Sequence, residues 1–180
     1  MSKSEYSEEN AYIQLIHDIH TKGEDDECRN GRVRCMFGAN MRFSMRNHKI
    51  PLLTSKRLAW KTCLKELLWF ISGNTSNKTL KSQNVHIWDG NSSREFLDSR
   101  GLTHLHEDDL GPIYGFQWRH YNAEYKTCDD DYSGKGIDQL QQIVEALKDP
   151  KERKSRRLIM SAWNPEQIGE MALPPCHVLC

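Results

Sequence analysis

The chain has 180 residues and carries equal numbers of basic and acidic side chains, 25 Lys+Arg against 25 Asp+Glu. This length favours a single domain, and we expect residues 1–180 to form one. The zero net charge argues against a partner held by bulk electrostatics, such as duplex DNA or an anionic membrane. Hydrophobic residues make up 37% and charged residues 28%, a composition that excludes a disordered chain.

The composition also bears on the cellular compartment. The first ten residues lack the apolar run of a secretory signal, and no segment approaches the ~18–20 apolar residues that span a bilayer. The six cysteines form no C-x-x-C pair, and without a signal their thiols are expected to be reduced. We therefore expect an intracellular, cytoplasmic protein, with nuclear entry left open.

The first third of the chain predicts one helix and one strand. Apolar residues between Tyr12 and Ile19 repeat at the spacing of an amphipathic helix, which Gly23 is expected to end. The polar segment 24–34 is typical of a loop. Residues 41–45, Met-Arg-Phe-Ser-Met, alternate apolar and polar side chains as a half-buried strand does.

The strongest helical signal covers residues 60–71, which Gly73 is expected to end. The segment 74–84 predicts a short polar helix, and Ser92 or Ser93 is placed to cap a turn that follows it. The 60–71 helix is expected to bury one apolar face with a 3.6-residue period. That face consists of Trp60, Leu64, Leu67, Leu68 and Ile71.

The last third predicts one helix and two strands. Apolar residues between Ile137 and Leu147 form a second amphipathic pattern, and the compact apolar runs 158–163 and 176–180 are typical of buried strands. This order of elements predicts an α/β (α+β) fold, a mixed β-sheet with packed helices. The chain stops inside the last strand signal, so we expect a fragment whose C-terminal part is missing.

Cys176 is the candidate nucleophile. It follows two prolines, which restrain the backbone, and precedes His177. A nucleophilic cysteine must react as its thiolate, which nearby arginines favour. The spacing by itself favours the alternative that Cys176 is a small buried residue of a strand.

Three further groups of side chains are candidates for chemistry or binding, and each also has a purely structural interpretation. Arg156 and Arg157 offer two planar forks of donors for a phosphate, or form a solvated basic loop. Glu66 lies at the edge of the apolar face of the 60–71 helix, where partial desolvation raises a carboxyl pKa and suits acid–base work; the alternative is a surface glutamate. Trp88 and Tyr114 supply rings for stacking on a heterocycle or for core packing.

A metal site is a weaker candidate. His104 and His106 precede the acidic run Glu107-Asp-Asp109, which together suggest ligands. The segment contains no further Cys or His pattern, and a solvated loop is the favoured interpretation.

Seven motifs, in this order, resemble those of thymidylate synthases. They are Thr54-Ser-Lys-Arg57, Lys65-Glu-Leu-Leu-Trp-Phe70, Ile87-Trp-Asp89, Asp109-Leu-Gly-Pro-Ile-Tyr-Gly-Phe-Gln-Trp-Arg-His120, Arg156-Arg-Leu-Ile-Met160, Ser161-Ala-Trp-Asn-Pro165 and Met171-Ala-Leu-Pro-Pro-Cys-His177. The resemblance extends from about Tyr12 to the last residue. Segments 91–98 and 121–136 are similar to insertions of the eukaryotic and large-DNA-virus branch.

The resemblance implies a homodimeric methyltransferase of the thymidylate synthase fold, which reductively methylates dUMP to dTMP. The implied co-substrate is 5,10-methylenetetrahydrofolate, which gives both the carbon and the hydride, and no metal is implied. By motif position, Cys176 is expected to add to C6 of the uracil ring, with Glu66 managing protons through ordered water. Tyr114 and His177 are expected to support the pyrimidine.

The resemblance also implies which residues contact the phosphate of dUMP and which contact the folate. Arg29 is expected to bind the nucleotide phosphate in its own subunit, whereas Arg156 and Arg157 reach the phosphate held by the partner subunit. The folate contacts are assigned to Ile87, Trp88 and, at the glutamate tail, Lys56.

The sequence departs from the family pattern in two places. The loop Arg29-Asn-Gly31-Arg-Val is one residue shorter than the family's and lacks one glycine. Motifs beyond the nucleophile, including the Asn that selects uracil over cytosine, are absent. The alternatives are a dCMP hydroxymethylase of the same superfamily, a non-catalytic fragment or dimerisation partner of a complete synthase, and an unrelated phosphate-binding module with an inert Cys. We expect the 180 residues by themselves to fold poorly and to make no dTMP.

Overall fold

The structure is a computed structural model that describes residues 8–28, 31–176 and 179–180. The chain divides into two compact units, Met1–Ala59 and Trp60–Cys180, and each is described by itself. Among the described residues, no helix combines the length and apolar character needed to cross a lipid bilayer.

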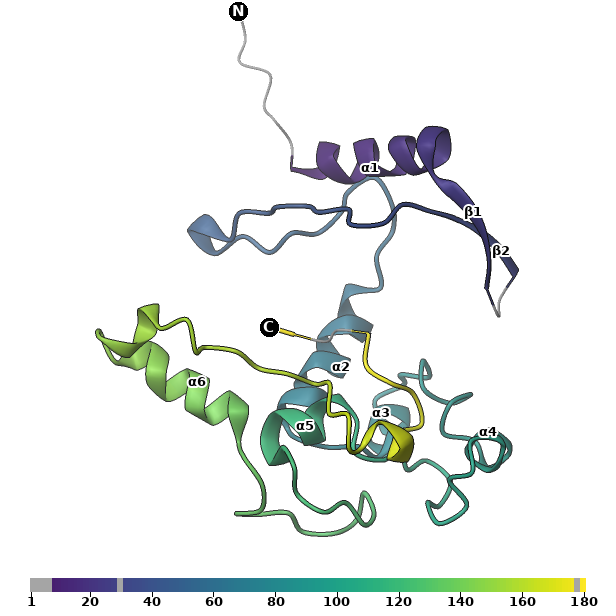
Figure 1. Ribbon diagram of the computed structural model, residues 1–180, viewed down its shortest axis with the longest axis vertical. Coiled ribbons are helices and arrows are strands. Elements are labelled where there is room, and N and C mark those ends of the chain that lie inside the picture. Colours follow the sequence, from purple (N-terminus) through teal and green to yellow (C-terminus); the bar gives the residue numbers. More distant parts are fainter. Residues whose placement is uncertain (1–7, 29–30, 177–178) are drawn as a thin grey trace, which may run out of the picture. The chain divides into compact units, whose positions relative to one another are not determined.

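In the described part of the Met1–Ala59 unit, an α-helix precedes a pair of antiparallel strands (Figure 1). Helix α1 (Glu9–Lys22) confirms the predicted helix, and Gly23 follows it directly. Strands β1 (Glu24–Cys28) and β2 (Gly31–Cys35) pair antiparallel, and a short 3₁₀ turn, η1, spans Arg46–His48.

Two predictions for this unit are wrong. The segment 24–34 is not a loop but the β1–β2 hairpin, whose side chains are all exposed and so leave no alternating pattern in the sequence. Asp25 accepts hydrogen bonds from Arg32 and Arg34 of the opposite strand, at 2.8 and 2.9 Å, and such cross-strand pairs stabilise a sheet without burial. Residues 41–45 form no strand, and Met41 and Met45 of the alternating pattern are exposed rather than half-buried.

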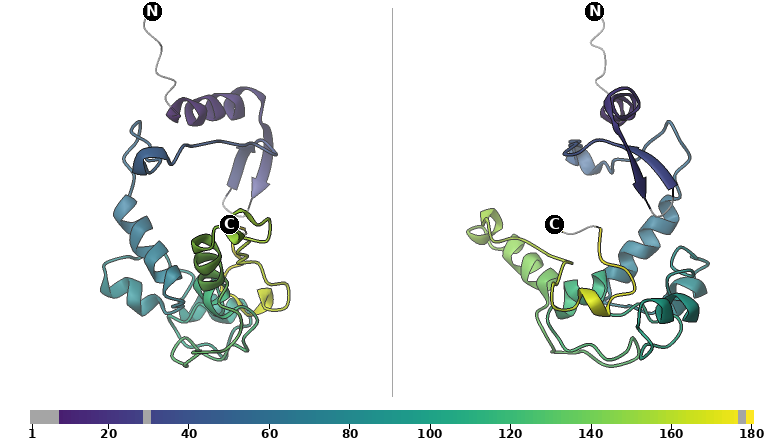
Figure 2. Two further views of the ribbon diagram at one scale, coloured as in Figure 1. Left: turned by 90° about the vertical axis from the view of Figure 1, so that its left-hand side faces the viewer. Right: turned by 45° about the vertical axis from the view of Figure 1, so that its right-hand side comes forward.

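The Trp60–Cys180 unit is built mainly of helices and long loops (Figures 1 and 2). The α-helices are α2 (Trp60–Ile71), α3 (Asn77–Ser82), α4 (Arg94–Ser99), α5 (Tyr114–His120) and α6 (Gln139–Lys148). Two 3₁₀ turns follow, η2 (Glu152–Lys154) and η3 (Ile168–Glu170). Helix α5 contacts both α2 and α6, and the chain after α6 returns alongside α5.

Local signals account for most of these helices. Gly73, with a φ of 77°, terminates α2 as predicted. Ser93 caps α4 by accepting a hydrogen bond from the backbone N–H of Phe96 at 3.2 Å. Asp138 caps α6 in the same way, so this helix begins two residues after the predicted Ile137. The unpredicted helix is α5, whose residues Tyr114 to Trp118 are all buried and carry no amphipathic period.

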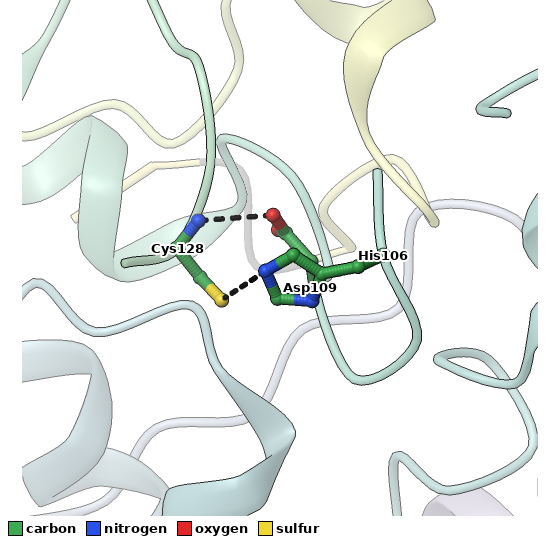
Figure 3. Close-up of side chains that lie close together, drawn as sticks. All are labelled: His106, Asp109 and Cys128. Atoms are coloured by element: carbon green, nitrogen blue, oxygen red, sulfur yellow. Dashed lines mark hydrogen bonds between the residues drawn. The ribbon is translucent and has the colours of Figure 1, made fainter. Parts of the chain in front are cut away.

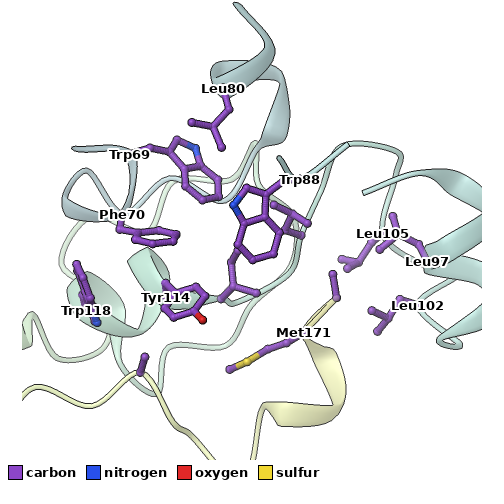
Figure 4. Packing of buried hydrophobic residues seen from close by; sticks show 14 of the residues in the cluster. Trp69, Phe70, Leu80, Trp88, Leu97, Leu102, Leu105, Tyr114, Trp118 and Met171 are labelled. Atoms are coloured by element: carbon purple, nitrogen blue, oxygen red, sulfur yellow. The ribbon is translucent and has the colours of Figure 1, made fainter. Parts of the chain in front are cut away.

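The core lies around α5 (Figure 4). Trp69 and Phe70 of α2 pack there, with ring centroids 5.3 Å apart, together with Leu80, Trp88 and Met171. The prediction that the periodic apolar face of α2 is buried is wrong, because its side chains are exposed in the described part of the chain. Helix α2 is apolar over most of its circumference, and α5 covers the side that carries Trp69 and Phe70. The predicted face is 36–56% exposed: Trp60, Leu64, Leu67, Leu68 and Ile71.

The strand prediction for residues 158–163 is also wrong, whereas the one for 176–180 falls partly on residues 177–178, which lie outside the described residues. Residues 158–163 contribute one antiparallel bridge, Ser161 to Leu179, rather than a strand. Met160 and Ala162 are buried while Ile159 and Trp163 are exposed, so the segment alternates instead of being buried on both faces. The fold class is nevertheless confirmed as α/β, since helices combine with a small antiparallel sheet.

The crossing of α2 and α5 depends on Gly115. A Cβ atom at this position would lie 2.6 Å from the carbonyl oxygen of Phe70, closer than real contacts allow. We expect Gly115→Ala to lower the free energy of unfolding by ~1–3 kcal/mol through overpacking. Thermal denaturation followed by circular dichroism measures this. Gly90→Ala is the matched control, because nothing lies within 4 Å of a Cβ there; an equal loss in both variants would contradict the packing argument.

Candidate functional site

The structure brings Cys176 and Tyr114 together from positions 62 residues apart. The Tyr114 hydroxyl lies 3.2 Å from Cys176 Sγ and also accepts a hydrogen bond from the Cys176 backbone N–H at 2.8 Å. Tyr114 is the first residue of α5 and is 4% exposed, whereas Cys176 is exposed. One buried hydroxyl therefore contacts both the side chain and the backbone of an accessible cysteine.

Aromatic packing fixes the position of Tyr114. Its ring lies with its centroid 4.6 Å from that of Phe70 and 6.3 Å from that of Trp88, the latter edge to face. Aromatic side chains locked in such contacts have little freedom to rotate. Figure 4 shows the side chains of Phe70, Trp88 and Tyr114 close together in this cluster. Phe70 thus belongs to the support of the site, although the sequence analysis gave it no role.

Glu66 joins the same region through Trp88. The Trp88 Nε1–H donates a hydrogen bond to Glu66 Oε1 at 2.7 Å. Glu66 is half-buried on α2, and Trp88 is 9% exposed. We name Glu66, Trp88, Tyr114 and Cys176 the thiol cluster. It combines a nucleophile, a hydroxyl beside it and an oriented carboxylate, which are groups suited to covalent and acid–base chemistry.

A buried amide network behind α5 was missed by the sequence analysis. Gln117 donates to the carbonyl oxygen of Pro112 at 2.8 Å and to Gln167 Oε1 at 2.9 Å, and it accepts from Asn164 at 3.2 Å. Because buried amides must be hydrogen-bonded, this network fixes α5 against the segment 161–170. Its signal in the sequence was a glutamine within the apolar run 113–118.

The arginine pair lies on the surface of the same unit. Arg156 and Arg157 are both exposed, and Arg157 lines a cleft beside α6 together with Gln139 and Gln142. Ile87, next to Trp88, is 51% exposed. The two residues predicted to contact folate therefore differ in exposure: the Ile87 side chain faces solvent, whereas the Trp88 ring is part of the core.

Lys56 belongs to the Met1–Ala59 unit. Its ammonium lies 5.6 Å from the ring centroid of Tyr12. Beside it, Glu9 accepts hydrogen bonds from the backbone N–H groups of Thr54 and Ser55, each at 2.7 Å. Hydrogen bonds to Glu9, the largest contribution from Ser55 and the next from Thr54, lower the pKa of Glu9 to about 2. The ionised Glu9 side chain therefore anchors the segment with Thr54 and Ser55 to α1. The predicted residues Arg29 and His177 lie outside the described residues.

The contact between Tyr114 and Cys176 predicts the effect of removing one hydroxyl. We expect Tyr114→Phe to lower the turnover of the full-length protein by ~10–100-fold, the equivalent of one hydrogen bond to a charged group. Steady-state kinetics with nucleotide binding measured separately checks this. Tyr132→Phe is the control, because it also removes a buried hydroxyl but lies in a different cluster. An equal fall in both variants would indicate a general loss of stability.

Comparison with known proteins identifies the family of the chain. Residues 10–180 match the family model described as thymidylate synthase. The chain is 53% identical over 184 residues to the probable thymidylate synthase of Schizosaccharomyces pombe, covering 99% of this chain and 29% of that protein. It is 50% identical over 183 residues to the thymidylate synthase of Candida albicans, covering 100% of this chain and 57% of that protein.

A third relative is the bifunctional dihydrofolate reductase-thymidylate synthase of Leishmania major, 52% identical over 174 residues, with 96% of this chain and 33% of that protein covered. The chain thus spans between 29% and 57% of the lengths of these three relatives. All three are eukaryotic proteins, in agreement with the branch that the insertions indicate. With nearly its whole length matched by the family model, the chain belongs to the thymidylate synthase family.

Proposed function

We propose that the full-length protein is a thymidylate synthase, which reductively methylates dUMP to dTMP with 5,10-methylenetetrahydrofolate and releases dihydrofolate. The observation that carries this proposal is the 3.2 Å contact between the Tyr114 hydroxyl and Cys176 Sγ. Membership of the family and the names of the relatives support it.

In the proposed reaction, Cys176 opens the sequence of steps. Its thiolate forms a bond to C6 of the uracil ring, and the π electrons of the C5–C6 bond move toward C5 and the O4 carbonyl. The exposure of Cys176 allows the ring to approach, and the Tyr114 hydroxyl lies where it can donate to the sulfur anion. The folate supplies the one-carbon unit that C5 attacks and the hydride that completes the methyl group.

Glu66 is proposed to handle protons beside the pyrimidine. The hydrogen bond from Trp88 fixes one carboxylate oxygen, while a carboxylate keeps acceptor capacity for water. General acid–base catalysis by a side chain held in this way contributes ~10²–10⁴-fold to rate. Trp88 is therefore a positioning residue for Glu66, in addition to its proposed contact with folate.

The remaining contacts are proposed from motif position. Arg29 and His177 bind dUMP within one subunit, and Arg156 and Arg157 reach the phosphate held by the partner of a homodimer. Both arginine side chains are exposed, which leaves them accessible to a phosphate bound by the partner subunit. Ile87 and Lys56, which are also exposed, are proposed to contact the folate ring and its glutamate tail.

The test follows both products at once. The full-length protein is incubated with dUMP and methylenetetrahydrofolate, and dTMP and dihydrofolate are quantified together. Reductive methylation forms them in equal amounts, because the hydride comes from the folate. Nucleotide modified without dihydrofolate, with dCMP preferred over dUMP, would identify a hydroxymethylase. No product from a folded dimer would favour the non-catalytic alternative.

A further inference from the structure

A second cluster of reactive side chains shares no residue with the thiol cluster (Figure 3). His106 and Asp109 come from the loop before α5, and Cys128 comes from the loop after it. One ligand atom from each residue lies within 4.8 Å of the others, and Cys128 Sγ is 3.8 Å from His106 Nε2. Asp109 is fully buried, and the other two are half-buried.

The distance between Cys128 Sγ and His106 Nε2 fits a cation with tetrahedral coordination. With Zn–S bonds of ~2.3 Å and Zn–N bonds of ~2.0–2.1 Å, a tetrahedral centre places its sulfur and nitrogen ligands about 3.6 Å apart. The observed 3.8 Å is close to this value. Asp129 adds a carboxylate oxygen 3.0 Å from His106 Nε2, so a fourth ligand stands beside the same nitrogen.

The imidazole of His106 is oriented for this role. Its Nδ1 lies 3.0 Å from the carbonyl oxygen of Glu107. A carbonyl oxygen only accepts hydrogen bonds, so Nδ1 donates its proton to it. Nε2 faces both Cys128 Sγ and the Asp129 carboxylate, and it offers its lone pair to a cation when its own proton is lost. Histidine ligands of metals are commonly held by such a bond from the other ring nitrogen.

Asp109 is held rigidly in the same place. Its Oδ1 accepts hydrogen bonds from the Tyr125 hydroxyl at 2.6 Å and from the Gly111 N–H at 2.9 Å. Its Oδ2 accepts a hydrogen bond from the Cys128 N–H at 2.9 Å, and a carboxylate oxygen has capacity to accept a further bond. The two aspartates place negative charge around the thiol and the imidazole.

We propose that His106, Cys128, Asp109 and Asp129 bind one zinc-class divalent cation, which ties the loop before α5 to the loop after it. Thiolate, imidazole and carboxylate together are a ligand set that zinc prefers. When the S–Zn bond forms, the S–H bond of Cys128 breaks and its proton passes to solvent. The site is structural and independent of the proposed reaction. The pair His104 and His106, considered from the sequence, is replaced by a pair of His106 with Cys128.

The test uses the full-length protein and the metal alone. One equivalent of Co²⁺ is added as a spectroscopic substitute for Zn²⁺, and the thiolate-to-cobalt charge-transfer band is recorded. We expect the band in the wild-type protein and its loss in Cys128→Ser. We expect His106→Gln to weaken binding by at least ~10-fold, measured by equilibrium dialysis with Zn²⁺. Cys63→Ser and His104→Gln are the matched controls and should bind as the wild type does.

A second measurement, the midpoint of thermal unfolding, tests the site without relying on variants that fold poorly. Zn²⁺ bound to the native state should raise the midpoint of thermal unfolding of the wild type and of both controls. The shift should be reduced in Asp129→Asn, whose side chain is 69% exposed and is not needed for folding. Absence of the charge-transfer band in the wild type, or a band of undiminished strength in Cys128→Ser, would overturn the proposal.

Discussion

Replacement of Cys176 by Ser is expected to reduce dTMP synthesis by the full-length protein at least ~10⁴-fold, because a serine hydroxyl is a far weaker nucleophile at neutral pH than a thiolate. Binding of dUMP should remain measurable, since the contacts to phosphate and base do not need the sulfur. The measurement pairs single-turnover dTMP formation with calorimetric titration of dUMP.

The control for this experiment is Cys180→Ser, which removes another exposed thiol four positions away. Cys180 contributes to the fold through backbone hydrogen bonds with Met160, which this substitution keeps. Its activity should equal that of the wild type. Turnover of the Cys176→Ser variant at the wild-type rate would remove Cys176 from the nucleophile role.

Mixing two inactive protomers is expected to restore activity. One protomer carries Cys176→Ser, and the other carries Arg156→Ala with Arg157→Ala. In a mixed dimer, one of the two sites receives an intact Cys176 and the intact arginine pair of its neighbour. Random exchange of subunits should restore about a quarter of the wild-type activity, because about half of the dimers are mixed and each has one complete site.

The control mixture combines Cys176→Ser with a protomer that carries all three substitutions, in which no complete site arises. Subunit exchange is demonstrated by native mass spectrometry of differently tagged protomers. If mixed dimers form and remain inactive, Arg156 and Arg157 do not act across the interface, and their assignment to the partner's phosphate is wrong.

Local sequence signals predicted the helices better than the strands. The periodic residues of α1 and α6, the cap at Ser93 and the stop at Gly73 all depend on neighbours within a few positions. The β1–β2 hairpin is fully exposed and is held by charge pairs, so it carries no alternating hydrophobic signal. Residues Tyr114 to Trp118 of α5 are all buried, including the polar Gln117, so the segment has no amphipathic period to detect.

The site could be predicted only in part. Cys176 was singled out from its sequence context, but its contact with Tyr114 joins positions 62 residues apart, which no local pattern encodes. The bond between Trp88 and Glu66 spans 22 residues in the same way. The family resemblance, rather than spacing, placed these residues in one site. Cys128 escaped the sequence analysis because it lies 22 residues from His106.

The central claim is that the Cys176 thiolate adds to C6 of dUMP, and hydrogen exchange at C5 tests it most directly. Addition at C6 makes C5 basic, so C5 takes up deuterium from D₂O and then loses its original proton before the thiolate leaves. Proton NMR of dUMP without folate follows the loss of the C5–H signal. The account predicts loss of this signal with the wild-type full-length protein and its persistence with Cys176→Ser. Equal exchange rates for the two proteins would contradict it.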